Sequence, residues 1–123
     1  MKRLSGILLL LSLLILGCQT AWAMNGEDLA DGMKSYVKAE KDYTPADFFM
    51  AGNYLGYIQG VAEATTADYS FPNTLTPDDL CRVVTRYLEK HPDKWKEPAS
   101  NLVRQALAQA SPKYVIRPPK YAD

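Results

Sequence analysis

The sequence predicts an all-α fold, a compact orthogonal bundle of four helices, or of five if a short turn adds one, followed by an extended C-terminal tail. Apolar residues recur at intervals of three and four, which is the period of one helix face. Capping signals precede these segments, and prolines fall at their ends rather than inside them. The 123 residues are enough for one domain.

The first predicted helix begins after Asn25, whose side chain can cap it. Asp28 lies in the first turn, where a carboxylate complements the helix dipole. The periodic pattern predicts that this helix runs to about Glu40. Its expected apolar face contains Leu29, Met33, Tyr36 and Val37.

The second predicted helix has a stronger start signal. Thr44 can cap, Pro45 suits the first turn, and Asp47 complements the dipole. The buried face that we expect for this helix contains Phe48, Ala51, Leu55, Ile58, Ala62 and Thr65.

Glycines recur every fourth residue inside this second helix, at Gly52, Gly56 and Gly60, and form a ridge without side chains. Each costs about 0.5–1 kcal/mol relative to alanine, and the close approach of another helix would make this cost tolerable. Two partners remain open: another helix of the same chain, or a second copy in a homodimer. Glu63 and Asp68 make a transmembrane dimer seam a poor interpretation.

Residues 65–75 form a predicted loop of about ten residues, which is long for a helical domain. Loops of this kind often carry binding residues. The alternative is that the two aromatic rings of the loop fold back onto the core. The candidate partner-binding residues are Asp68, Tyr69, Phe71 and Asn73.

Two further helices complete the predicted bundle. The third follows the cap Thr76 and ends near Lys90, because Pro92 restricts the residue before it. The last begins at Pro98 and stops at Pro112. Residues 113–123 show little periodicity and form the extended or disordered tail. The apolar faces contain Leu80, Val83, Val84, Tyr87 and Leu88 in the third helix, and Leu102, Val103, Ala106, Leu107 and Ala110 in the last.

Residues 1–23 have the pattern of a secretory signal peptide. Two cationic residues precede an apolar run of about ten, which is too short to span a bilayer. The triplet Ala21-Trp22-Ala23 then offers a cleavage site, which leaves a helical domain over residues 24–112. The competing interpretation is a lipoprotein acylated at Cys18. Both interpretations predict export, and we expect a periplasmic location.

No arrangement of reactive side chains predicts catalysis. Cys81 and His91 are ten residues apart on one predicted helix, about 15 Å along its axis, so they cannot form a thiol–imidazole pair. One histidine and two cysteines are too few for a zinc or iron–sulfur site. The 14 basic and 14 acidic residues argue against nucleic acid as the partner. We therefore predict no enzyme activity, cofactor or metal.

Two blocks of sequence resemble a known family. The first is Tyr54-Leu55-Gly56-Tyr57-Ile58-Gln59-Gly60-Val61, and the second runs from Leu75 through His91-Pro92-Asp93 to Leu107. Their order and spacing are similar to the Rap/Tai immunity proteins against type VI secretion amidase effectors. The resemblance covers roughly residues 25–112. It implies an exported, helical and often dimeric protein that binds a papain-like peptidoglycan amidase in the periplasm and blocks its active site.

The chain departs from this family in its cysteines. The family usually carries four, at positions that correspond here to Gly32 or Met33, Tyr54, Ser70 and Lys113, so the disulfides of the family are absent. Two other functions stay open beside this one. One is a periplasmic acid-stress chaperone of the HdeA kind. The other is a non-catalytic accessory subunit that assembles through the glycine ridge.

Overall fold

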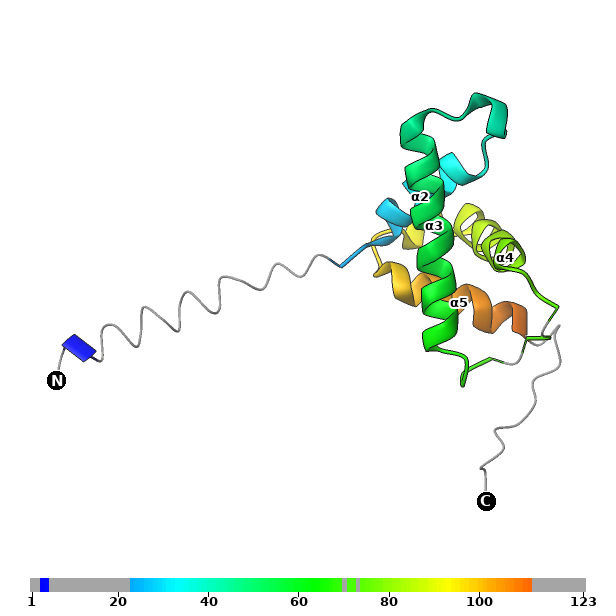
Figure 1. Ribbon diagram of the computed structural model, residues 1–123. Coiled ribbons are helices and arrows are strands. Elements are labelled where there is room, and N and C mark those ends of the chain that lie inside the picture. Colours follow the sequence, from blue (N-terminus) through cyan, green and yellow to red (C-terminus); the bar gives the residue numbers. More distant parts are fainter. Residues whose placement is uncertain (1–2, 5–22, 70, 73, 112–123) are drawn as a thin grey trace, which may run out of the picture.

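The computed structural model describes residues 3–4, 23–69, 71–72 and 74–111, and it confirms the all-α class. Over residues 23–111 the chain forms four α-helices and two 3-10 turns. The long helix α3 crosses α5 steeply and also packs against α2 and α4 (Figure 1). The predicted tail, residues 113–123, lies outside the described residues. The elements are α2 (Gly26–Tyr36), η1 (Glu40–Asp42), α3 (Pro45–Ala64), α4 (Pro77–Lys90), η2 (Pro92–Lys94) and α5 (Ala99–Ala110).

Capping boxes begin three of the four helices, as the sequence predicted. In each box the cap side chain accepts a hydrogen bond from the backbone of the third helical residue, whose carboxylate accepts one from the cap backbone. The last helix starts after Pro98 without a side-chain cap. None of the described helices is both long enough and apolar enough to cross a membrane. The caps are Asn25, Thr44 and Thr76, and their partners are Asp28, Asp47 and Asp79.

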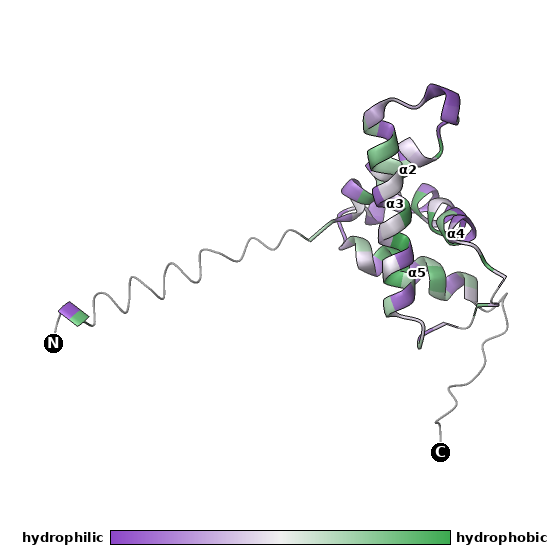
Figure 2. Ribbon diagram, in the orientation of Figure 1, coloured by the Kyte–Doolittle hydropathy of each residue, from purple (hydrophilic) through white to green (hydrophobic). Residues whose placement is uncertain are grey.

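The first helix is shorter than predicted, because it ends at Tyr36 rather than near Glu40. Val37 is its C-cap and is 56% exposed, so the prediction that Val37 belongs to the apolar face is wrong. Tertiary contacts turn the chain at this point. The residues that follow are polar and form the hydrophilic η1 corner seen in Figure 2.

The buried face of α3 is rotated from the predicted one. Phe48, expected in the core, is 62% exposed, whereas Asp47 and Tyr54 are buried. The helix is apolar almost all the way round, so hydrophobicity alone does not select one face. The tertiary contacts of Asp47 and Tyr54 determine which face of the helix is buried. The buried residues of α3 are Asp47, Ala51, Tyr54, Ile58 and Ala62.

Tyr54 connects three helices at the centre of the core. Its side chain is almost fully buried, and its ring centroid lies 5.3 Å from that of Tyr36 on α2. Its hydroxyl is 2.9 Å from the Thr85 hydroxyl on α4. The surrounding apolar side chains include Leu29, Ile58, Val84, Leu88, Leu102, Val103 and Leu107.

Gly32 on α2 and Tyr54 on α3, two of the positions related above to cysteines of the Rap/Tai proteins, pack against each other in this core. A Cβ atom placed on Gly32 would lie 3.1 Å from the Cβ of Tyr54, which is shorter than the separation of about 3.5–4.5 Å in a disulfide. The other two positions, Ser70 and Lys113, lie outside the described residues.

Candidate functional site

Cys81 has the environment of a structural thiol rather than of a nucleophile. It is fully buried in α4, and burial raises the pKa of its thiol to about 11. The thiol is therefore protonated near neutral pH and is a poor nucleophile. His91 is the C-cap of the same helix, where its ring stacks on Tyr87 with 4.4 Å between centroids. Among the described residues, no group of three His, Cys, Asp or Glu side chains is arranged to hold a metal.

The aromatic residues of the 65–75 loop fold back onto the core, which was the alternative to an exposed contact surface. Tyr69 is only 9% exposed, and its hydroxyl donates a hydrogen bond to the Arg104 carbonyl at 3.4 Å. Phe71 packs beside it, with 5.9 Å between ring centroids, and is partly buried. Both rings border a hollow of about 430 Å³ between this loop, α3 and α4.

The structure describes only one of the remaining two loop candidates. Asp68 is exposed and forms an ion pair of 3.3 Å with Arg104 on α5. Asn73 lies outside the described residues. The structure therefore does not gather the four candidates into one exposed surface, because Tyr69 belongs to the core and Asp68 is the exposed member among those described.

The glycine ridge faces outward from the domain. Gly52, Gly56 and Gly60 are exposed, and a Cβ atom placed on any of them would have no neighbour within 4 Å. The alternative in which another helix of the same chain packs on the ridge finds no support among the described residues, because no described helix lies there. The other alternative, a homodimer face, stays a prediction.

The outward face of α3 is apolar and uncharged over most of its length. Between Asp47 and Glu63 the helix contains no charged residue. At its N-terminal end, Phe48 and Phe49 are 62% and 69% exposed. Exposed aromatic groups on an uncharged surface are typical of protein–protein contact sites.

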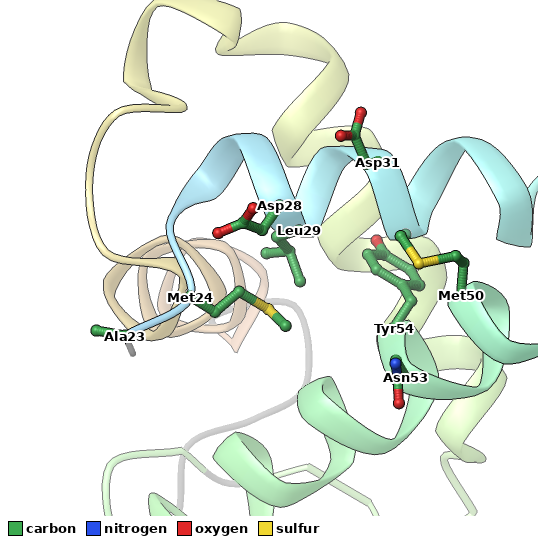
Figure 3. A pocket seen from close by; sticks show the side chains of 9 residues that line it. Ala23, Met24, Asp28, Leu29, Asp31, Met50, Asn53 and Tyr54 are labelled. Atoms are coloured by element: carbon green, nitrogen blue, oxygen red, sulfur yellow. The ribbon is translucent and has the colours of Figure 1, made fainter. Parts of the chain in front are cut away.

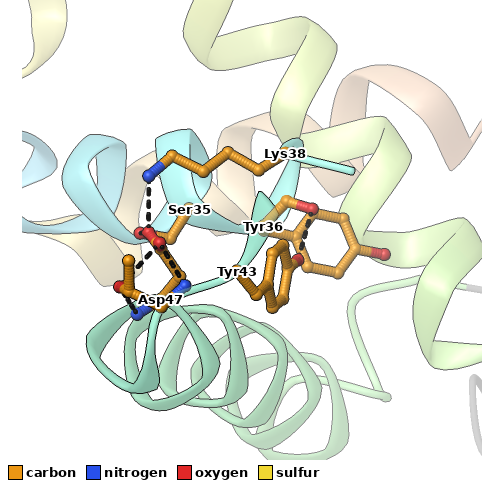
Figure 4. Close-up of polar contacts among 6 residues, drawn as sticks. Ser35, Tyr36, Lys38, Tyr43 and Asp47 are labelled. Carbon is orange, nitrogen blue, oxygen red and sulfur yellow. Dashed lines mark hydrogen bonds and ion pairs between the residues drawn. The ribbon is translucent and has the colours of Figure 1, made fainter. Parts of the chain in front are cut away.

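A buried carboxylate fixes the corner that presents these phenylalanines (Figure 4). One oxygen of Asp47 accepts hydrogen bonds from the Ser35 hydroxyl at 2.9 Å and the Lys38 ammonium at 2.8 Å. The other accepts hydrogen bonds from the Thr44 hydroxyl at 2.8 Å and amide at 3.0 Å. The contact with Lys38, followed by those with Thr44 and Ser35, holds the pKa of Asp47 well below its usual range. The carboxylate is therefore ionised wherever the protein is folded near neutral pH.

Tyr43 completes the corner. Its hydroxyl donates to the Tyr36 carbonyl at 3.0 Å, and its ring meets Phe48 edge to face with 4.9 Å between centroids. The sequence analysis missed this surface. Phe48 and Phe49 are adjacent and so point about 100° apart on a helix. That spacing signals that both cannot belong to one narrow buried stripe.

A groove of about 390 Å³ runs between α2 and α3 beside this face (Figure 3). Its floor is apolar, with Met24 and Leu29 on one side and Met50 and Tyr54 on the other. Two carboxylates, of Asp28 and Asp31, also line it. Asp31 is paired with Lys34 at 2.7 Å, and Asp28 belongs to the capping box of α2.

Comparison with known proteins places these features in a family. No curated protein sequence matches the chain. A family model described as Rap1a immunity proteins matches residues 18–112, which span the whole described bundle and agree with the Rap/Tai resemblance. The chain therefore belongs to the Rap1a immunity protein family.

Proposed function

We propose that this protein binds and blocks a peptidoglycan amidase effector of a type VI secretion system in the periplasm, and thereby protects the cell that makes it. Family membership supports binding to an effector protein. The Rap/Tai resemblance supports the amidase target, and the predicted signal peptide over residues 1–23 supports the periplasm. The buried, protonated Cys81 agrees with a function that depends on the surface rather than on a reactive group.

The observation that carries the proposal is the uncharged, exposed face of α3. Phe48 and Phe49 project from it and are held by the capped, hydrogen-bonded corner around Asp47. A ring already packed against the domain, as Phe48 is against Tyr43, loses little conformational freedom on binding, which favours affinity. We therefore assign the effector contact to Phe48 and Phe49. Asp68, exposed on the 65–75 loop, is a second contact candidate.

The glycine ridge, which begins one turn after Phe49 on this face, is the proposed homodimer contact. Gly52 lies three residues after Phe49 and Gly60 eleven, about 4.5 and 16 Å along the helix axis, so the ridge leads away from the two phenylalanines. An exposed glycine lets a partner helix approach the backbone closely. Replacing Gly56 with leucine would block this approach. Because its Cβ has no neighbour within 4 Å, the variant should still fold as a monomer.

The proposal predicts that a gene beside this one encodes a peptidoglycan hydrolase, and that enzyme is the test partner. The protein lacking residues 1–23 should bind it at micromolar concentration or below and stop its hydrolysis of peptidoglycan. Replacing Phe49 with alanine should weaken binding about tenfold or more, as for a central aromatic contact. The matched control replaces Arg86, which is exposed on α4, and this substitution should change the affinity little. Absence of binding at micromolar concentration contradicts the proposal.

A further inference from the structure

The first residues after the predicted leader are built into the fold. The Ala99 amide donates a hydrogen bond to the Met24 carbonyl at 2.9 Å, and the Gly26 amide donates to the Glu97 carbonyl at 2.9 Å. An isolated antiparallel bridge lies between these two bonds. Residues 24–26 are thereby docked on the segment that leads into α5. Figure 3 shows Ala23 and Met24 beside this part of the domain.

Gly26 packs so closely that no side chain fits at its position. A Cβ placed on it would lie 2.6 Å from both the Cα and the carbonyl oxygen of Trp95, and would also collide with the Leu102 side chain. The contact is backbone against backbone, so it cannot be relieved by rotating a side chain. Releasing residues 24–26 therefore requires the segment to leave the domain, which exposes the buried end of α2.

We propose that the Ala23–Met24 bond is hydrolysed only while residues 24–26 are undocked, so that removal of the leader precedes completion of the fold. The inference rests on the proposed export. A processing protease binds its substrate as an extended strand on both sides of the bond, and it needs the backbone groups that the fold already uses. In the docked chain, cleavage must wait for local opening, whose population is small.

The chemical step is an ordinary peptide hydrolysis by a signal peptidase. Water adds its hydroxyl to the Ala23 carbonyl carbon, the bond to the Met24 nitrogen breaks, and the nitrogen takes up a proton to become the new amino terminus. The competing lipoprotein route cuts before Cys18 instead. That bond is six residues or about 20 Å of extended chain away from Met24, so docking does not protect it.

Timed digestion of the complete 123-residue chain tests this order. The chain is diluted from denaturant into detergent, a signal peptidase is added after increasing delays, and the products are identified by mass. We expect cleavage between Ala23 and Met24 at short delays, falling at least tenfold once circular dichroism shows that refolding is complete. The variant Gly26→Val should restore cleavage at long delays, whereas Gly56→Ala, on the exposed ridge, should not.

Each of the other outcomes contradicts a different part of the proposal. Equal cleavage at short and long delays refutes the proposed order while leaving export intact. Cleavage by the signal peptidase at another bond refutes the assigned bond. No cleavage at any delay refutes the predicted leader on which the inference rests. If Gly26→Val does not refold, the delay series of the unaltered chain still decides the question.

Discussion

Replacing Gly52, Gly56 and Gly60 together with alanine should stabilise the isolated domain. A new Cβ at each position meets no atom within 4 Å, so the change adds helix propensity without a clash. Each substitution should contribute about 0.5–1 kcal/mol, and the three together about 2 kcal/mol. The stability gain is specific to an exposed ridge, because a ridge packed against another helix would be crowded by the same methyl groups.

Urea unfolding followed by circular dichroism measures this gain. With a denaturant slope of about 1–3 kcal/mol per molar, the midpoint should rise by about 1 M. Gly26→Ala is the contrasting control. Its methyl group would lie 2.6 Å from the Trp95 backbone, so it should lower stability by about 1–3 kcal/mol. A lower midpoint for the triple variant in dilute, monomeric protein would refute the placement of the ridge on the surface.

Two further predictions concern the core and the corner. Tyr54→Phe removes the hydroxyl that lies 2.9 Å from Thr85 and should lower the free energy of unfolding by about 1–2 kcal/mol, measured in the same urea titration. A smaller loss would mean that the buried pair contributes little. Hydrogen bonds hold the folded pKa of Asp47 below its unfolded value of about 3.9, so its stabilisation is complete above about pH 4 and is lost as the pH falls towards the folded pKa. Asp47→Asn should therefore make stability between pH 7 and pH 3 less dependent on pH, and an unchanged pH profile would contradict this role.

Helix starts were predictable because their signals are local. Thr44 and Thr76 are each followed at fixed spacings by a proline and an aspartate. The hydrogen bonds between the threonine and the aspartate form within one helical turn. The end of α2 was not predictable in the same way. Just beyond this end, Lys38 forms an ion pair with a carboxylate nine residues further along the chain. A tertiary contact of this kind leaves no periodic trace in the sequence.

The buried face of α3 was predicted only in part, because apolar residues surround the helix, although Ala51, Ile58 and Ala62 are buried as expected. Periodicity placed Phe48 inside, but the polar network of Asp47 and the contact of Tyr54 with Thr85 decide which side is buried. The glycine pattern had the same ambiguity. Spacing shows that side chains are absent from one stripe, but it does not show whether that stripe faces the core or solvent.

The placement of the aromatic rings in the 65–75 loop could not be predicted for a related reason. Composition indicates an aromatic segment. Whether its rings point outward depends on the space that the other helices leave beside the loop. Tyr69 finds that space beside α5 and is buried there. Among the described residues the strongly exposed aromatic side chains are instead Phe48 and Phe49, which were not expected to bind a partner.

Binding to the peptidoglycan amidase that the proposal expects to be encoded beside this gene tests the central claim most directly. We expect the domain of residues 24–112 to form a stable complex with the amidase and to abolish its activity at equimolar ratio. The double variant Phe48→Ala, Phe49→Ala should remain folded and lose this inhibition. Turnover of a cell-wall fragment by this protein alone, or unimpaired inhibition by the double variant, would contradict a function carried by the exposed face of α3.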